Sequence, residues 1–322
     1  MILIPILTVF FALTLDLVFG DPKNKFHPTA WVGTVIARLV PLAKNQNQTR
    51  EKIGGILVTV LASALVVVLL LPYEYAIRNV SGTVLTIIVI LVGSLLLKTT
   101  IAIRGLEKHG KLVMESISKN NLEEARSRLA MLVKRTTKDL DRNHIISATL
   151  ESTSENIVDG ITGPLFYFGL FGLPGAFVYR TINTIDSMIG YKTALFRNVG
   201  WFGASCDKVL NYLPARITGL VMILAAVLVR ADWKNCLITM RRDGKNTESP
   251  NAGYPMAAMA GALGTRFEKI DHYTLGNGTM ILDESHFRSA VLLMKVTGIL
   301  FCVLITMPLI ILLSYLGWWI HV

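Results

Sequence analysis

The feature that most constrains this chain is a set of long apolar runs. Four runs are long enough to cross the ~30 Å hydrocarbon layer of a bilayer. They cover Met1–Phe19, Ile56–Leu71, Val84–Ile103 and Val291–Ile320, and two shorter runs cover Pro164–Tyr179 and Ile217–Val229. Inside lipid, backbone amides and carbonyls must be satisfied within the spanning segment, as they are in a helix. The sequence therefore predicts an all-α integral membrane helical bundle with about four to six spans.

The composition agrees with a membrane protein. Hydrophobic residues make up 52% of the chain and charged residues only 17%, against about a quarter in soluble domains. The three cysteines form no CxxC pair, so the sequence indicates neither a disulfide framework nor a zinc site. The net charge of +10 is attributed to basic residues in cytoplasmic loops of a membrane protein rather than to nucleic-acid binding.

Basic residues are unevenly divided between the predicted loops. If all six runs cross, loops 20–53, 104–163 and 230–290 hold 24 Lys and Arg, whereas loops 72–83 and 180–216 hold 6. Basic residues collect on the cytoplasmic side of membranes. The three large loops are therefore predicted to face the cytoplasm, with both termini outside, in a multi-pass protein of the cell membrane.

Two of the six runs leave the topology open. The run 164–179 contains Gly169, Gly172, Pro174 and Gly175, a pattern typical of a broken or re-entrant helix. If this run and 217–229 only dip into the membrane, loop 180–216 changes side. The sequence leaves open whether these two runs cross the membrane fully or re-enter on the same side. Pro214 is predicted to lie in the first turn of the helix that contains the second run.

The domain organisation is predicted to be one integral membrane domain, residues 1–322. Residues 104–160 form a mostly helical cytoplasmic insertion, and residues 230–290 form a second cytoplasmic loop region. Within the first, Asn121 is expected to cap a helix whose first turn contains Glu123 and Glu124.

The acidic stripe Glu151, Glu155 and Asp159 is the first candidate site. On a helix these carboxylates repeat every four residues and repel one another. A divalent cation would relieve that repulsion, and oxygen ligands together with substrate phosphates suit Mg²⁺. The alternative is an ordinary solvated helix face.

Three further clusters combine charges and amides near the ends of apolar runs. Arginine there can hold a phosphate or carboxylate, or can simply anchor the helix at the headgroups. An aspartate within an apolar run marks a functional site by default. The small residues 257–264 are predicted to form a closely packed helix. The clusters are Arg180, Asn183, Asp186, Tyr191 and Lys192, followed by Asp207, Asn211 and Arg216; Ser249 and Asn251; and Asp16, Asp21 and His27.

These motifs occur in a characteristic order. They are Leu15-Asp16, Gly20-Asp21-Pro22, His27-Pro28, ESTSENIVDG at 151–160, RTINTIDSMIGYK at 180–192, NYLPAR at 211–216 and SPNAGYPMAAMAGALG at 249–264. Together they resemble the CobD/CbiB family of cobalamin biosynthesis, the membrane-bound adenosylcobinamide-phosphate synthases. The chain departs from the family pattern at Lys208, Thr247 and Met256, and no role is assigned to those positions.

The resemblance implies an amide ligase. Such an enzyme joins aminopropanol or its O-phosphate to a propionate carboxylate of adenosylcobyric acid, giving adenosylcobinamide or its phosphate. Because a carboxylate is a poor acyl donor, the reaction implies ATP and Mg²⁺ as well as the corrinoid substrate. No nucleotide-binding motif is recognisable, since Leu112 follows the GxxxxGK-like stretch 105–111 where a P-loop has Ser or Thr.

Residue type suggests roles within that reaction. The acids are expected to bind Mg²⁺ or to act as a base, the cations to hold phosphate or carboxylate, and the amides to orient the corrinoid. Glu151, Glu155, Asp159 and Lys192 are expected to act in catalysis, with the three acids as the Mg²⁺ ligands. The expected substrate-binding residues are Asp16, Asp21, His27, Asn156, Arg180, Asn183, Asp186, Tyr191, Asp207, Asn211, Arg216, Ser249 and Asn251.

Two other classes of function stay open at this point. A corrinoid transporter would also carry polar residues and broken helices in the membrane, although no inverted repeat is visible. A non-catalytic membrane sensor is the second. The lipid bilayer is an expected partner and nucleic acid is not. The sequence leaves open the preferred acceptor, the oligomeric state and any complex with other enzymes of the pathway.

Overall fold

The structure is a computed structural model that describes residues 2–22 and 24–317. Five of its helices are long and apolar enough to cross a membrane. These candidate spans are Gln48–Arg78, Thr83–Ser118, Arg142–Ile189, Trp201–Leu228 and Glu284–Tyr315. The prediction of an all-α membrane bundle is confirmed. The last residues of the predicted run 291–320 lie outside the described part of the chain.

The chain divides into two compact units, each assembled from separate stretches. The first unit contains residues 1–102, 163–211 and 302–322, and the second contains 103–162 and 212–301. The prediction of a single domain did not include this division. Both predicted loop regions, 104–160 and 230–290, fall entirely in the second unit.

The first unit contains the apolar helices nearest the two termini. Its elements are α1 (Leu3–Phe19), η1 (Asn24–Phe26), α2 (Pro28–Ala43), α3 (Gln48–Arg78), α4 (Thr83–Lys98), α8 (Gly163–Ile189), the first part of α9 (Trp201–Leu228), η3 (Cys302–Thr306) and α13 (Met307–Tyr315).

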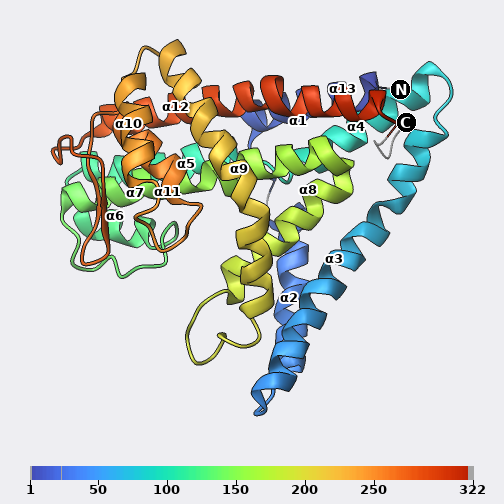
Figure 1. Ribbon diagram of the computed structural model, residues 1–322, viewed down its shortest axis with the longest axis horizontal. Coiled ribbons are helices and arrows are strands. Elements are labelled where there is room, and N and C mark those ends of the chain that lie inside the picture. The colour runs from blue at the N-terminus through green and yellow to red at the C-terminus, as the bar shows by residue number, and fades with distance from the viewer. Residues whose placement is uncertain (1, 23, 318–322) are drawn as a thin grey trace. The chain divides into compact units, whose positions relative to one another are not determined.

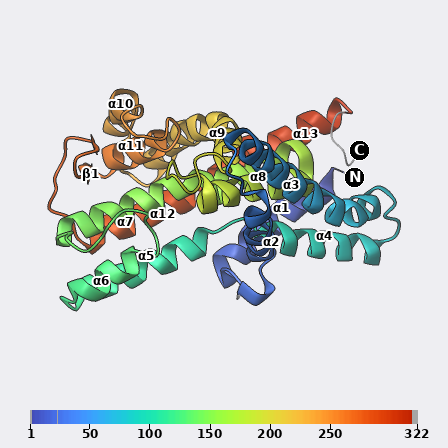
Figure 2. The same ribbon diagram turned by 90° about the horizontal axis from the view of Figure 1, so that it is seen from below.

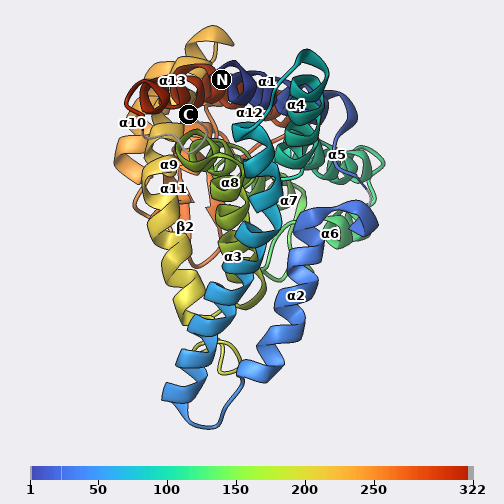
Figure 3. The same cartoon turned by 90° about the vertical axis from the view of Figure 1, so that its right-hand side faces the viewer.

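Two helix pairs organise this unit. Helices α2 and α3 form a hairpin (Figure 1), in which Asn47 caps α3 by accepting from the amides of Thr49 and Arg50. Helices α1 and α4 also lie side by side (Figure 3). A buried cluster that includes Ile36, Val58 and Ile185 joins the α2–α3 hairpin to α8. Apolar packing therefore holds α8 against two membrane-length helices.

Helix α8 is broken inside the apolar run 164–179, as the sequence predicts. Phe171 and Gly172 leave the helical conformation, and Gly172 has a φ of 64°. A left-handed φ is readily adopted by glycine but strained for other residues. Gly172 and Pro174 together account for the break, because proline cannot donate the helical hydrogen bond.

Helix α9 corrects the prediction for Pro214. The helix already begins at Trp201, so Pro214 lies inside it rather than in its first turn. A proline there leaves the carbonyl four residues earlier, that of Leu210, without its helical donor. The hydroxyl of Tyr167 donates to this carbonyl at 3.0 Å. The proline is tolerated because a side chain replaces the missing amide.

The second unit is a helical assembly with one small hairpin. In Figure 2, α7 and α12 run alongside each other, and α5 and α6 lie at the edge of the same unit. The two strands are the only departure from helix among its described elements. Its elements are α5 (Ile103–Ser118), α6 (Leu122–Leu129), α7 (Arg142–Ile157), η2 (Val158–Thr162), the second part of α9, α10 (Trp233–Asp243), α11 (Gly253–Ala262), β1 (Phe267–Lys269), β2 (Tyr273–Leu275) and α12 (Glu284–Phe301).

Two predictions within this unit are confirmed. Asn121 caps α6, because its side chain accepts from the amide of Glu124 at 3.1 Å. The small-residue stretch 257–264 packs closely, and α11 lies against α10. The amide of Asn235 on α10 donates to the carbonyl of Gly261 at 2.9 Å.

Gly261→Ala is expected to destabilise the protein. A Cβ at this position would lie 2.4 Å from the Asn235 carbonyl oxygen and 2.8 Å from Thr239 Cβ. Because backbone cannot yield as a flexible side chain does, the free energy of unfolding should fall by about 1–3 kcal/mol. Thermal denaturation in detergent measures this. Gly33→Ala is the control, since its Cβ would make only ordinary contacts at 3.7 Å and beyond. Equal melting temperatures for the two variants would contradict the expectation.

Asp243 joins α10 to the β-hairpin. Its carboxylate accepts from Arg242 Nη2 at 2.6 Å and from the amide of Gly276 at 2.7 Å. The Arg242 guanidinium, with the Gly276 amide, holds the pKa of this carboxyl below its usual value.

Asp243→Asn is therefore expected to cost about 2 kcal/mol of stability at pH 7. A depressed pKa stabilises the fold above the unfolded value of about 3.9, and this stabilisation is lost as pH falls through the folded value. Melting temperatures measured between pH 7 and pH 3 should converge for wild type and variant below about pH 4. A constant difference over that range would contradict the assignment.

Candidate functional site

The predicted site residues are distributed over both units. The first unit contains the motifs near the N-terminus and those of residues 180–211. The second contains the acidic stripe, Arg216 and the SPN turn. The geometry is therefore described unit by unit.

In the first unit, hydrogen bonds join residues from two separate motifs. Arg180 Nη1 donates to Asn183 Oδ1 at 3.1 Å, and Asn183 Nδ2 donates to Asp207 Oδ1 at 3.3 Å. Asn211 Nδ2 donates to Asp207 Oδ2 at 3.0 Å and its Oδ1 accepts from the Tyr179 hydroxyl at 2.6 Å. We call these five residues the amide–aspartate chain. It links the second half of α8 to the first half of α9.

Tyr179 is the member of the amide–aspartate chain that was not predicted from the sequence. Its ring is fully buried and stacks on Tyr167, with centroids 5.2 Å apart. A Cβ on Gly163 would lie only 2.2 Å from the ring, so glycine is needed to admit it. Nothing in the local sequence distinguishes this tyrosine from an interfacial aromatic residue.

The Gly20-Asp21-Pro22 motif contacts a lysine from another helix of the first unit. Lys98, buried on α4, donates to the carbonyl of Gly20 and lies 3.8 Å from Asp21 Oδ1. His27 Nε2 lies 3.6 Å from the same carboxylate oxygen. Lys98 was visible in the sequence as a single charge inside an apolar run. Such a charge needs a partner, and this signal could have joined it to Asp21.

The remaining predicted residues of this unit are Asp16, Asp186, Tyr191 and Lys192. Asp16 is fully buried on α1, and Asp186 is half-buried on α8. Tyr191 lies beside Phe196, with ring centroids 6.4 Å apart, and Lys192 is exposed in the segment after α8. Their expected roles stay predictions.

In the second unit, Glu151 is fully engaged by neighbouring side chains. Its side chain is buried, and Oε1 accepts from Arg135 at 3.1 Å and from Ser147 at 2.9 Å. Oε2 accepts from the Tyr273 hydroxyl at 3.0 Å. Burial and the Glu151 carboxylate raise the pKa of Tyr273, so the hydroxyl stays protonated as the donor. Glu151 thereby ties α7 to the β-hairpin.

Glu155 lies one turn further along α7 and differs from Glu151. It is exposed, and it makes no hydrogen bond or ion pair with the part of the chain that the structure describes. Its charged neighbours include Asp159, Lys134 and Lys269. The stripe passes into the π-helical turn η2, a type of turn often found at functional sites. Glu155 thus differs from Glu151 in its exposure and in having no hydrogen-bond partner within the described residues.

The three acids do not form a preassembled metal site. Within residues 2–22 and 24–317, no group of three or more His, Cys, Asp or Glu side chains is arranged to hold a metal ion. The physical reason is that both oxygens of Glu151 are turned to Arg135, Ser147 and Tyr273. A Mg²⁺ ion held by one or two carboxylates together with substrate phosphates still fits Glu155 and Asp159.

Arg216 is clamped between two tyrosines. Its guanidinium carbon lies 3.6 Å from the ring centroid of Tyr212 and 4.5 Å from that of Tyr254. Its Nη1 donates to Asn251 Oδ1 at 2.8 Å. Asn251 follows Ser249, whose hydroxyl accepts from the Asn251 amide at 3.5 Å. Arg216 therefore fixes the turn that opens α11, and the three predicted residues Arg216, Ser249 and Asn251 lie together.

Comparisons with known proteins decide the family. The family model described as "CobD/Cbib protein" matches residues 9–294. This chain belongs to the CobD/CbiB family. The resemblance recognised in the sequence motifs is thus confirmed over most of the chain.

Relatives named for cobalamin biosynthesis match between 83% and 90% of this CobD/CbiB chain. The chain is 39% identical over 293 residues to a "Probable cobalamin biosynthesis protein CobD" of Methanothermobacter thermautotrophicus, covering 90% of this chain and 93% of the relative. It is 40% identical over 267 residues to a protein of the same name from Thermoplasma volcanium, covering 83% and 84%. A "Cobalamin biosynthesis protein CobD" of Dehalococcoides mccartyi is 37% identical over 266 residues, covering 83% and 85%. No solved structure matches the chain significantly.

The sequence of this CobD/CbiB chain predicted the acidic site residues and Arg216, but it did not predict several side chains that contact them. Arg135 lies in the segment before α7, and Tyr273 lies on β2, more than a hundred residues away from Glu151. Tyr254 stands in the quoted SPNAGYP motif, but its place over Arg216 depends on the tertiary fold.

Proposed function

We propose that this chain catalyses the amide-forming step of cobalamin biosynthesis expected of the CobD/CbiB family. Aminopropanol or its O-phosphate would be joined to the propionate carboxylate of adenosylcobyric acid. The product would be adenosylcobinamide or its phosphate. The family membership over residues 9–294 is the observation that carries this proposal. The relatives named for cobalamin biosynthesis support it.

The chemistry requires activation of the carboxylate. In the proposed route, a carboxylate oxygen attacks the γ-phosphorus of ATP, giving an acyl phosphate and ADP. The amine nitrogen then attacks the acyl carbon, the C–O bond to phosphate breaks, and one proton leaves the nitrogen. A base near the amine and cations near the phosphate lower the barriers of these steps.

Glu155 is assigned the role of the base in this route. Its carboxylate is exposed and free of hydrogen bonds within the described chain, so it can accept a proton from the amine. Lys134 and Lys269 are charged neighbours of Glu155 and would hold phosphate oxygens. Glu155 with Asp159 would also suit Mg²⁺, which supplies charge neutralisation on the nucleotide phosphates when bound.

Glu151 takes a different role in the proposal. Because three donors already occupy its oxygens, it acts as a positioning residue that holds α7 against the β-hairpin. Arg216 and Asn251 are assigned to the corrinoid. Arginine matches a carboxylate in geometry, and a side-chain amide matches the amide groups of the ring periphery.

A conversion assay tests the proposal. Purified protein in detergent would be incubated with cobyric acid, Mg·ATP and either aminopropanol or its O-phosphate, and the corrinoid would be examined by mass spectrometry. A product heavier by the amine minus water is expected only when ATP is present. Unmodified corrinoid under all conditions would overturn the proposal. ATP-independent passage of corrinoid into liposomes would instead support a transporter.

Arg216→Lys is expected to raise the KM for the corrinoid about tenfold, with a smaller change in kcat. Lysine keeps the charge but loses the planar fork that contacts Asn251 and stacks between Tyr212 and Tyr254. A tenfold change corresponds to about 1.4 kcal/mol. Steady-state kinetics measure this effect, and Arg241→Lys, an exposed residue on α10, is the control. Unchanged KM in Arg216→Lys would remove Arg216 from corrinoid binding.

A further inference from the structure

A basic surface at the tip of the α2–α3 hairpin takes no part in the proposed function. In the sequence, residues 38–52 contain four Lys and Arg and one acid, and residues 187–206 contain two Lys and Arg and no acid. Both stretches belong to the first unit. We call the surface that they form the hairpin-tip surface. It is defined by Lys44, Arg50, Lys52, Leu195, Arg197 and Trp201.

Segment 190–200, which joins α8 to α9, packs on the first turns of α3 (Figure 3). Asn198 Nδ2 donates to Glu51 Oε2 at 3.0 Å, and Val199 belongs to the same buried cluster as Val58. A Cβ on Gly55 would lie 2.1 Å from the Val199 carbonyl oxygen, so glycine admits the close approach of the two backbones. The hairpin tip and segment 190–200 therefore form one continuous surface.

The acid of this surface, Glu51, is engaged by neighbouring side chains. Its buried carboxylate accepts from Lys44 Nζ at 2.7 Å and from Asn198. Arg197, which is exposed, is a further charged neighbour of Glu51. One carboxylate thus faces two cations, and it leaves the charges of Arg50 and Lys52 unbalanced.

Arg50 carries a charge that its own helix disfavours. It lies in the first turn of α3, where the helix dipole repels cations. Its side chain is exposed and makes no hydrogen bond or ion pair with residues 2–22 or 24–317. Lys52 is also exposed, and its Nζ lies 5.7 Å from the ring centroid of Trp201. An external anion would offset this excess of positive charge.

Apolar side chains lie exposed beside these cations. Trp201 is 50% exposed and Leu195 60% exposed. Ile53, also exposed, follows Arg50 by three residues and begins the apolar face of α3, which is a candidate span. Tryptophan and basic residues at the start of a spanning helix are typical of the headgroup layer of a membrane.

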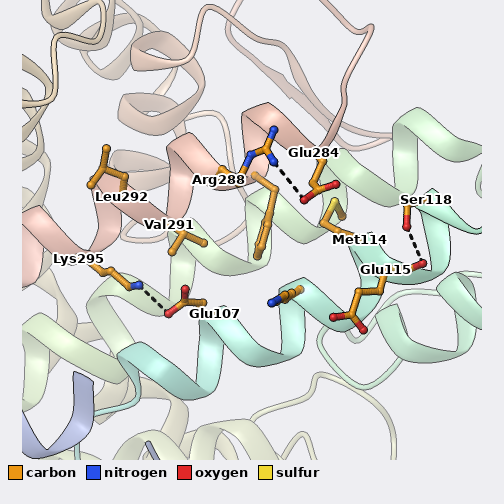
Figure 4. A pocket seen from close by; sticks show the side chains of 11 residues that line it. Glu107, Met114, Glu115, Ser118, Glu284, Arg288, Val291, Leu292 and Lys295 are labelled. Atoms are coloured by element: carbon orange, nitrogen blue, oxygen red, sulfur yellow. Dashed lines mark hydrogen bonds and ion pairs between the residues drawn. The ribbon is translucent and has the colours of Figure 1, made fainter. Parts of the chain in front are cut away.

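The largest pocket of the described chain offers no comparable excess of charge. It opens between α5 and α12, and three acids and three cations line it. Figure 4 shows two of these cations directed at acids, with Lys295 at 2.7 Å from Glu107 and Arg288 at 3.5 Å from Glu284. The other two are Lys111 and Glu115. An anionic ligand is therefore matched better by the hairpin-tip surface than by this pocket.

Charge and position together favour lipid as the occupant. An acidic protein would match the cations, but it would not account for exposed tryptophan and leucine at the start of a candidate span. We propose that the hairpin-tip surface lies at the cytoplasmic face of the membrane and binds the headgroups of anionic phospholipids. Basic residues collect on that face, and its lipids carry negative charge. The proposal does not rest on the amide-forming reaction.

The proposal also fixes the side of segment 190–200. Because this segment packs on the start of α3, it shares a membrane face with residues 44–52. Loop 180–216 then lies in the cytoplasm, which is the arrangement in which run 164–179 re-enters. The break at Gly172 allows the chain to turn back within that run.

Cysteine labelling tests the side. Gln46→Cys and Ala194→Cys, both at exposed positions, would each be made in a Cys206→Ser background. A membrane-impermeant maleimide should label both in inverted vesicles and neither in right-side-out vesicles. Labelling of the two positions from opposite faces, or of both from the outside, would overturn the proposal.

Tryptophan quenching tests the lipid. The full chain would be reconstituted with brominated phosphatidylglycerol or brominated phosphatidylcholine, without corrinoid or ATP. The difference between wild type and Trp201→Phe isolates the quenching at Trp201. Phosphatidylglycerol is expected to bind there more tightly than phosphatidylcholine. Arg50→Gln should lower this preference about fivefold, and the added change Arg197→Gln should lower it further.

Lys111→Gln is the matched control, because Lys111 is an exposed lysine on α5 outside the hairpin-tip surface. It should leave the preference at Trp201 unchanged, and melting temperatures check that each variant is folded. Equal quenching by the two lipids would overturn the proposal and favour an acidic protein as the occupant. An unchanged preference in the folded Arg50→Gln, Arg197→Gln variant, or an equal loss in Lys111→Gln, would also overturn it.

Discussion

Glu155→Gln is expected to slow amide formation by about 10²-fold or more while the protein stays folded. The substitution keeps the size of the side chain and removes its charge and basicity. Because Glu155 makes no hydrogen bond or ion pair in the described chain, no structural partner is lost. Single-turnover conversion of cobyric acid, followed by mass spectrometry, measures the effect.

Glu123→Gln is the matched control for this variant. Glu123 is also an exposed acid on a helix of the second unit, and it lies on α6 away from the stripe. Its substitution should leave both turnover and melting temperature unchanged. Wild-type turnover in Glu155→Gln would remove Glu155 from the reaction, even if the enzyme activity itself is confirmed.

Glu151→Ala is expected to reduce the stability of the protein strongly, whereas Glu155→Gln leaves the fold intact. The change leaves the Arg135 guanidinium without its carboxylate and the Ser147 and Tyr273 hydroxyls without their acceptor. Removing one partner of a buried ion pair costs about 3–5 kcal/mol, and the partial exposure of Arg135 places this case near the lower end. Thermal denaturation in detergent measures the change.

Glu124→Ala provides the comparison for Glu151→Ala. Glu124 pairs with Arg128 on α6, and the two side chains are 39% and 26% exposed. Exposed ion pairs contribute about 0–1 kcal/mol, so this variant should melt close to wild type. Equal melting temperatures for Glu151→Ala and Glu124→Ala would show that Glu151 does not anchor the β-hairpin.

The fold could be predicted wherever local sequence determines it. Apolar length located the five candidate spans, whereas the predicted run 1–19 forms the shorter apolar helix Leu3–Phe19. Asn121 predicted the start of α6, and Gly172 with Pro174 predicted the break in α8. Pro214 was misplaced because a proline inside a helix resembles a proline at its start. The difference lies in Tyr167, a distant residue that supplies the missing donor.

The candidate site could be predicted only in part. Two motifs, around Asn183 and Asn211, were identified separately, and the structure joins them through Asp207. The four-residue spacing predicted the same role, Mg²⁺ binding or base catalysis, for Glu151 and Glu155, since both occupy equivalent helical positions. They differ because Arg135 and Tyr273 reach Glu151 from remote segments, and no local pattern encodes that contact. The contact of Lys98 with Asp21 differs in this respect, because a charged residue inside an apolar run is expected to have a partner of opposite charge.

If this chain activates a corrinoid carboxylate with ATP and condenses it with a small amine, an oxygen of that carboxylate must leave with the phosphate. Cobyric acid labelled with ¹⁸O in its free carboxylate is the substrate for this test. One labelled oxygen is expected in the released inorganic phosphate for each amide formed. Amide product accompanied by unlabelled phosphate, or no amide product at all, would contradict it.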